Sequence, residues 1–399
     1  MPHDLPLIST VAVGLGVAFA GGFAAVRLGL PPIVGYLLAG VAIGPFTPGF
    51  VGDLHLAREL AEIGVMLLMF GVGMHFSIRD LLSVRRIAVP GAVGQIALAT
   101  MLGVGLSHFW GWTIGAGIVF GLALSIASTV VMLRALEARG MLDDADGRIA
   151  VGWLIVEDLF TVAVLVLIPA LASLGDGPLS AQRLALPLAL TFGKVAVFIV
   201  LMLLVGARVM PWLLDQVVRT GSRELFALAV IAAALGIAFA AARLFDVSFA
   251  LGAFFAGIVV SASDHSHRAA EQAKPLEDAF AVLFFLSVGM LFDPGILVRH
   301  PFQVLAVVAV ILLGKSIAAF LIVRIAGYPA STALTVSASL AQIGEFSFMV
   351  TALGTAHRLL SAEGQNLVLA GALISITANP AAFRLAAILR RRLDRSPAG

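Results

Sequence analysis

The segment SIASTVVM, residues 125–132, places three hydroxyl side chains in the middle of an apolar run. A second apolar run is interrupted at QIGEFSFM, residues 342–349, which lies 217 positions further along the chain. Polar or unwound backbone at mid-depth in a membrane is tolerated only where protein buries it or where it lines a water-filled cavity. Paired interrupted segments in corresponding halves of a chain point to the binding site of a secondary transporter.

Two more pairs of segments recur at nearly the same offset. GYLLAGVAIG (35–44) resembles GAFFAGIVVS (252–261) at an offset of 217, and FGVGMHF (70–76) resembles LSVGMLF (286–292) at 216. The offset covers seven apolar runs, an odd number, so the second copy has to cross the membrane in the opposite direction. We therefore predict an inverted-topology repeat of the kind found in secondary transporters.

The composition predicts an all-α polytopic membrane protein. Hydrophobic residues make up 60% of the 399-residue chain and charged residues 12%, whereas an ordinary soluble domain carries about 25% charged residues. The chain has no cysteine, which excludes disulfides and thiolate metal sites. Because the sequence also lacks the nucleotide-binding and zinc-binding motifs of soluble enzymes, we expect no cofactor, no resident metal and no enzymatic activity. The net charge of +2 gives no indication of a nucleic-acid partner.

Apolar runs of about 20 residues, the length of a membrane-spanning helix, predict about thirteen spans. Their approximate limits are 6–26, 31–46, 58–75, 88–108, 113–135, 149–172, 186–208, 223–242, 247–263, 276–292, 302–323, 331–354 and 366–388. We assign 6–172 to the first repeat, 186–208 to a linker helix and 223–388 to the second repeat. Residues 1–390 then form one transmembrane domain, followed by a basic cytoplasmic tail at 391–399.

The distribution of basic residues predicts the orientation. With the N-terminus outside, most of the 25 lysines and arginines fall in segments on the inner side, as the positive-inside rule requires. An odd number of spans then leaves the C-terminus in the cytoplasm. The N-terminus, MPHDLPLIST, lacks the basic region and cleavage site of a signal peptide, so we expect a retained first helix.

Three ionisable residues fall near the middle of predicted spans: Asp158, Lys315 and Glu345. An uncompensated charge at that depth costs about 2.5–3.5 kcal/mol on insertion scales, so such groups pair with one another or line a cavity. Glu157 precedes Asp158 directly, and consecutive helical residues do not face each other. One carboxyl group can therefore pair with Lys315 while the other faces water and cations. A protonated, hydrogen-bonded carboxyl group and an inert ion pair are the plain structural alternatives.

The two interrupted segments add polar candidates beside these charges. Ordinary packing of small residues explains the serines well but explains Glu345 poorly. Lys194 lies nearer a predicted span end, where a long side chain reaches the interface. The DHSH sequence at 264–267 fits a solvated inner loop, with metal binding or pH sensing as alternatives. The candidates in the interrupted segments are Ser125, Ser128, Thr129, Gln342 and Glu345.

Taken together, these motifs resemble the Kef-type branch of the monovalent cation:proton antiporter-2 family. The resemblance runs from about residue 8 to 388 and rests on GYLLAGVAIGP, LLMFGVGMHFS, SIAST, VED, GAFFAGIVVS, FFLSVGM, the mid-span lysine and LAQIGEFSF. It implies a thirteen-helix antiporter fold with a core domain, a dimerising panel and discontinuous helices that cross at 113–135 and 331–354. It further implies that Asp158 exchanges cation and proton, and that Lys315 pairs with the variable position at Glu157.

Two features depart from the best-known Kef members. Those members carry Gln-Asp where this chain carries Glu157 and Asp158, so the resemblance does not imply glutathione-gated potassium efflux. Kef-type chains also usually continue into a cytoplasmic nucleotide-binding regulatory domain beyond the point where this sequence ends, at RRRLDRSPAG. Such a domain is an expected regulatory partner.

We therefore expect a homodimeric K⁺ or Na⁺/proton antiporter of the bacterial inner membrane that works by alternating access. The expected cation and proton site consists of Asp158, Glu157, Ser128 and Thr129, with Lys315 as charge partner and Ser125, Gln342 and Glu345 in support. A sodium-coupled organic-anion symporter of a related inverted-repeat fold is one alternative, and a cation channel is another. An intramembrane enzyme would need a mid-span histidine, a metal motif or a second facing aspartate, which the sequence does not supply.

Overall fold

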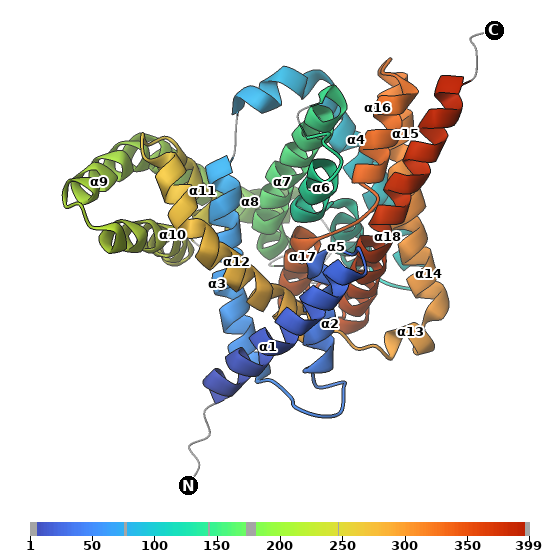
Figure 1. Cartoon of the computed structure of the whole chain (residues 1–399), viewed down its shortest axis with the longest axis horizontal. Coiled ribbons are helices and arrows are strands. Elements are labelled where there is room, and N and C mark those ends of the chain that lie inside the picture. The colour runs from blue at the N-terminus through green and yellow to red at the C-terminus, as the bar shows by residue number, and fades with distance from the viewer. Residues whose placement is uncertain (1–5, 76–77, 143, 173–180, 246, 396–399) are drawn as a thin grey trace. The chain divides into compact units, whose positions relative to one another are not determined.

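A computed structural model of the chain describes residues 6–75, 78–142, 144–172, 181–245 and 247–395 (Figure 1). Every regular element in these ranges is a helix, so the prediction of an all-α protein is confirmed. The elements are α1 (Pro6–Arg27), α2 (Pro32–Ala42), α3 (Leu54–His75), α4 (Ile78–Phe109), α5 (Ile114–Ser125), α6 (Thr129–Glu137), α7 (Ala145–Ala172), α8 (Ala181–Leu201), η1 (Met202–Gly206), α9 (Ala207–Arg219), α10 (Arg223–Phe245), α11 (Phe249–Ser261), α12 (Ser266–Met290), α13 (Ile296–Arg299), α14 (Pro301–Ala309), η2 (Val310–Gly314), α15 (Lys315–Ile325), α16 (Ala330–Ser339), α17 (Glu345–Ala356) and α18 (Ala362–Arg395), where η1 and η2 are π-helical turns.

Eight helical segments in the described part of the chain are long and apolar enough to cross a membrane, and α2 and α11 are shorter apolar helices. Each of the predicted spans coincides with helical residues. The chain is therefore a multi-pass membrane protein, while the total of thirteen spans stays a prediction.

The chain divides into two compact units, and each unit draws helices from both repeats. One unit contains α3 and α8–α12 together with most of α1 and α2. The other contains α4–α6, most of α7 and α13–α18. The two repeats are thus interleaved in space.

Close glycine contacts in the first unit show the repeat directly. Figure 1 shows α3 beside α11 and α12. Gly73 of α3 meets Gly257 of α11, and Gly40 of α2 meets Gly289 of α12. A Cβ atom on any of these four residues would overlap backbone atoms of the facing helix. Gly257 is the repeat equivalent of Gly40 at the offset of 217, and Gly289 is the equivalent of Gly73 at the offset of 216. The two contacts are therefore equivalent, and the same helix crossing occurs twice.

Both interrupted spans are discontinuous helices in the second unit, as predicted. The first span ends as α5 at Ser125 and resumes as α6 at Thr129. The second ends as α16 at Ser339 and resumes as α17 at Glu345. Several backbone N–H and C=O groups of the residues between have no partner in the helices, and inside a membrane those groups need other partners.

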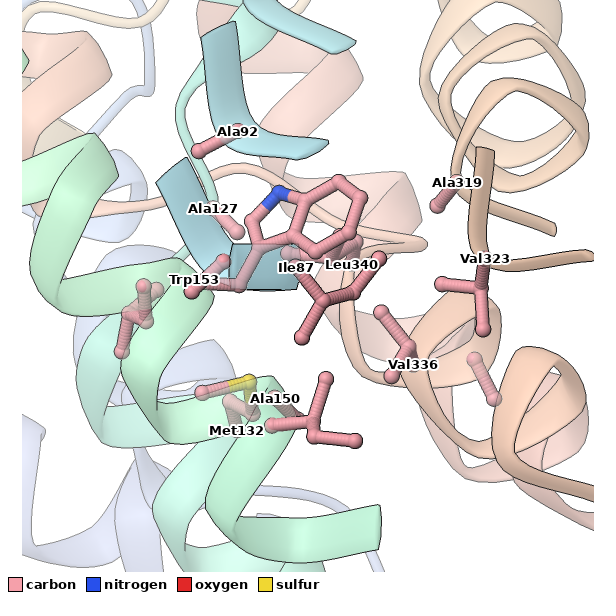
Figure 2. Close-up of a cluster of buried hydrophobic side chains, with 14 of the residues drawn as sticks. Ile87, Ala92, Ala127, Met132, Ala150, Trp153, Ala319, Val323, Val336 and Leu340 are labelled. Atoms are coloured by element: carbon pink, nitrogen blue, oxygen red, sulfur yellow. The ribbon is translucent and has the colours of Figure 1, made fainter. Parts of the chain in front are cut away.

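An apolar cluster in the second unit fixes the rotation of α7. Figure 2 shows the indole of Trp153 surrounded by residues of α4, α6, α15 and α16. The Trp153 side chain is completely buried, and a Cβ atom on Gly91 of α4 would overlap its ring. Trp153 lies one helical turn before Glu157, so this packing determines the direction in which α7 presents Glu157 and Asp158.

Candidate functional site

Three consecutive residues at the first helix break, 127–129, each contact the buried carboxyl group of a residue on another helix. The backbone N–H of Ala127 donates to Oε2 of Glu157 at 2.9 Å. The hydroxyl of Ser128 donates to Oε2 of Glu345 at 2.7 Å. The hydroxyl of Thr129 lies 3.4 and 3.3 Å from Oδ1 and Oδ2 of Asp158. The break therefore gathers carboxyl groups from α7 and α17 around a single turn of backbone.

Gln342 joins the two breaks to each other. Its Oε1 accepts from the backbone N–H of Ser128 at 2.8 Å, and its Nε2 donates to the carbonyl groups of Ser128 at 3.1 Å and Ser339 at 3.3 Å. The hydroxyl of Ser347 donates to the carbonyl of Ile126 at 3.3 Å. Side chains at the second break thus bond to backbone groups of the first.

The breaks approach so closely that Gly344 has no room for a side chain. A Cβ atom there would overlap the backbone and side chain of Ser128. Ser128 and Glu345, which are hydrogen-bonded, are separated by 217 residues, the offset of the repeat. A residue that touches its own repeat equivalent lies at the pseudo-two-fold axis that relates the two copies.

Three polar residues outside the predicted set support the crossing. Gln95 Nε2 donates to the carbonyl of Ser125 at 3.0 Å, and Asn379 Nδ2 donates to the carbonyl of Ala338 at 3.0 Å. The hydroxyl of Ser375 accepts from the backbone N–H of Ile343 at 3.4 Å. These residues are not among the candidates predicted from the sequence, although a polar side chain in the middle of an apolar span is a usable signal.

Lys315 is completely buried and tied to the second break. Its Nζ donates to the carbonyl of Gln342 at 3.0 Å. Lys315 and Glu157 interact electrostatically, but no direct salt bridge joins them in the described part of the chain. The π-helical turn η2 ends one residue before Lys315, and such turns occur frequently at functional sites.

The predicted site residues differ in their exposure and in which of their atoms bond to the helix crossing. The side chains of Glu157, Glu345 and Lys315 have no exposed surface, and that of Asp158 retains 5%. The Ser125 hydroxyl donates within its own helix to Leu122 at 2.7 Å, so only its carbonyl joins the crossing.

Two polar features lie outside this network. Lys194 is exposed on α8 of the other unit. In the DHSH segment, His265 Nε2 lies 2.9 Å from Oδ1 of Asp215 on α9. The described residues contain no group of three or more His, Cys, Asp or Glu side chains that could hold a metal ion.

Comparison with known proteins decides the family. Residues 14–387 match the family model described as "Sodium/hydrogen exchanger, transmembrane". The chain belongs to the sodium/hydrogen exchanger family. This exchanger-family chain is 59% identical over 386 residues to the putative cation/proton antiporter YbaL of Escherichia coli (strain K12), covering 96% of the chain and 69% of YbaL.

Two further likenesses extend the comparison. The K(+) efflux antiporter 4 of Arabidopsis thaliana is 33% identical over 384 residues, which cover 96% of this exchanger-family chain and 64% of the plant protein. The chain therefore spans about two thirds of the length of YbaL and the plant protein. The sodium proton antiporter MjNhaP1 of Methanocaldococcus jannaschii shares the fold with a TM-score of 0.72 at 16% identity, covering 96% of this chain and 98% of MjNhaP1. The resemblance to the monovalent cation:proton antiporter-2 family is confirmed.

Proposed function

We propose that the chain is a K⁺ or Na⁺/proton antiporter that works by alternating access, with Asp158 binding either the proton or the cation. Family membership supports cation/proton antiport in general. It also favours transport over an intramembrane enzyme.

The observation that carries the role of Asp158 is the difference between the three carboxyl groups. Glu157 and Glu345 accept hydrogen bonds at 2.9 and 2.7 Å, whereas Asp158 has only the long contacts of 3.3 and 3.4 Å to Thr129. Asp158 also retains exposed surface, which the other two lack. A carboxyl group that exchanges ligands has to be loosely held and accessible, and Asp158 fits both conditions.

The surrounding residues have distinct proposed roles. Thr129 and Ser128 offer hydroxyl oxygen atoms, which replace part of the hydration shell of a monovalent cation. Glu157 and Lys315 balance each other's charge and tie α7 and α15 to opposite breaks. Every residue of this site belongs to one compact unit. That unit can therefore expose the site to one side of the membrane and then to the other without breaking the hydrogen bonds between the site residues.

The remaining expectations are part of the same proposal. We place the protein in a bacterial inner membrane with its N-terminus outside and its C-terminus in the cytoplasm, from the distribution of lysine and arginine. We also propose a homodimer and a cytoplasmic nucleotide-binding regulatory partner, from the family resemblance alone.

The test is a proteoliposome assay in which a proton gradient is imposed and Li⁺, Na⁺, K⁺ or Rb⁺ is added while internal pH is recorded. We expect cation-dependent proton movement in the wild type and its loss in Asp158→Asn. Asp278→Asn is the matched control, because the Asp278 side chain is 61% exposed and pairs with Lys274 on the surface of α12. Absence of cation-driven proton movement, or full activity in Asp158→Asn, would sink the proposal.

The same assay separates the alternatives. A sodium-coupled organic-anion symporter would take up an anion without exporting protons. A channel would pass cations far faster than about 10³ per second, a rate that conformational steps of microseconds to milliseconds or slower do not support.

A further inference from the structure

We propose that Glu345 is a second proton-binding group of the transport site and that it shares one proton with Asp158. The inference rests on the proposed antiport function and extends it from one carboxyl group to a pair.

The first step is the balance of charge. Glu157, Asp158, Glu345 and Lys315 are all buried in one network. Moving an ion into such an interior costs several kcal/mol unless an opposite charge compensates it. Lys315 compensates one carboxylate, so two more would remain unbalanced if all three were ionised. The site therefore needs a bound proton or a bound cation.

The second step identifies the two unbalanced carboxyl groups. Lys315 acts on Glu157, which leaves Asp158 and Glu345. Adjacent hydroxyl groups, those of Thr129 and Ser128, hold these two side chains, and the two carboxyl groups interact electrostatically. Two carboxyl groups that are buried in one site with no second counter-charge do not readily ionise together, and such a pair holds one proton between them.

The third step is an oxygen atom without a partner. Glu345 has no exposed surface, and its Oε2 is bonded to Ser128, yet its Oε1, like that of Glu157, has no hydrogen-bond partner among the described residues. A buried polar atom left unsatisfied costs about 1–3 kcal/mol. A proton bound to the Glu345 carboxyl group removes the charge beside this unpartnered oxygen and so lowers the cost of burying it.

Other groups around the pair determine how firmly the proton is held. The ionisable side chains in this network besides the pair are Glu157 on α7 and Lys315 on α15. From the described parts of α4, α6, α16 and α18 only uncharged polar groups reach the crossing. The Ser128 hydroxyl donates to the Glu345 carboxyl group, and a donor in that position interacts more favourably with the ionised form than with the protonated form.

A shared proton also determines the net charge of the site in its proton-bound and cation-bound states. With one proton on the pair, the four groups and the proton carry a net charge of −1. With a monovalent cation in place of the proton, the net charge is again −1. The pair thus releases one proton for each cation bound, and the site has the same net charge in both states.

The experiment measures the acid limb of the pH–activity profile, where protons displace the cation. Glu345→Gln keeps the size of the side chain and can still accept from Ser128, but it removes the charge that holds the proton. We expect the acid limb to move to lower pH by about one unit or more. Ser128→Ala removes a donor to ionised Glu345, so it should move the limb to higher pH. Glu137→Gln, an exposed position at the end of α6, is the control and should leave the limb in place.

The outcomes are distinct. Opposite shifts in Glu345→Gln and Ser128→Ala support the shared proton. An unmoved acid limb in an active Glu345→Gln protein overturns it while leaving the antiport proposal intact, and if that variant does not fold, an unmoved limb in Ser128→Ala overturns it instead. A wild type without cation-driven proton movement removes the underlying function, which is a different failure.

Discussion

Replacement of Gln342 by alanine should destabilise the crossing of the two broken helices more than any surface substitution. The change removes hydrogen bonds of 2.8, 3.1 and 3.3 Å. The N–H of Ser128 loses its acceptor in a fully buried place, which costs about 1–3 kcal/mol. The carbonyl of Ser128 keeps the N–H of Met132, so it and the carbonyl of Ser339 together lose about 1–2 kcal/mol. We expect a loss of about 2–5 kcal/mol in all.

The assay is unfolding in mixed micelles by titration with a denaturing detergent, followed by circular dichroism. Gln216→Ala is the control, because Gln216 is exposed on α9 and surface changes stay within about 0.5 kcal/mol. A loss below about 1 kcal/mol in Gln342→Ala would refute the reasoning, since the breaks would then satisfy their backbone groups without this side chain.

Three smaller predictions test other parts of the structure. Gly91→Ala should cost about 1–3 kcal/mol by overpacking against Trp153, and melting temperatures should show partial recovery when Trp153→Phe is added; no recovery would contradict that packing. Thr129→Val should raise the cation concentration for half-maximal transport about fivefold, because a hydrogen bond contributes about 1 kcal/mol, while Thr377→Val, a control within α18, should leave it unchanged. A hydrogen bond from Arg299 lowers the pKa of Asp293, which lies outside the predicted spans, so this pair stabilises the fold above about pH 4 and its contribution is lost at more acid pH. The stability difference between wild type and Asp293→Asn should shrink accordingly on acidification, and a constant difference would contradict the pairing.

The elements predicted from the sequence are those with a local signal. Polar residues inside apolar runs revealed both helix breaks, and a constant offset revealed the inverted repeat. The mid-span positions of Asp158, Lys315 and Glu345 were likewise visible, because charge at that depth is costly wherever the helix lies. None of these inferences needed to know which helices are neighbours.

The features that the sequence analysis missed depend on neighbours. Gln342 was a candidate, but its bonds to the N–H and C=O groups of Ser128 follow from the crossing and not from its own segment. Gln95 and Asn379 were overlooked because a single amide in an apolar helix has many possible partners. The position of Trp153 against Gly91 and the π-helical turn before Lys315 result from tertiary packing, for which the sequence offers no period or motif.

The inverted repeat allows the same residue at equivalent positions of the two copies, whereas the chemistry of the site requires different residues. At the glycine crossings each residue meets a partner other than its own equivalent, as Gly40 meets Gly289, so both copies can keep the same glycine. Ser128 and Glu345 instead meet each other. Two serines there would remove the second carboxyl group from the site, and two glutamates would set like charges against each other in a buried place. The copies therefore have to differ where they touch at the axis, and the hydroxyl–carboxyl pair that results is the part of the site that the repeat itself could not supply.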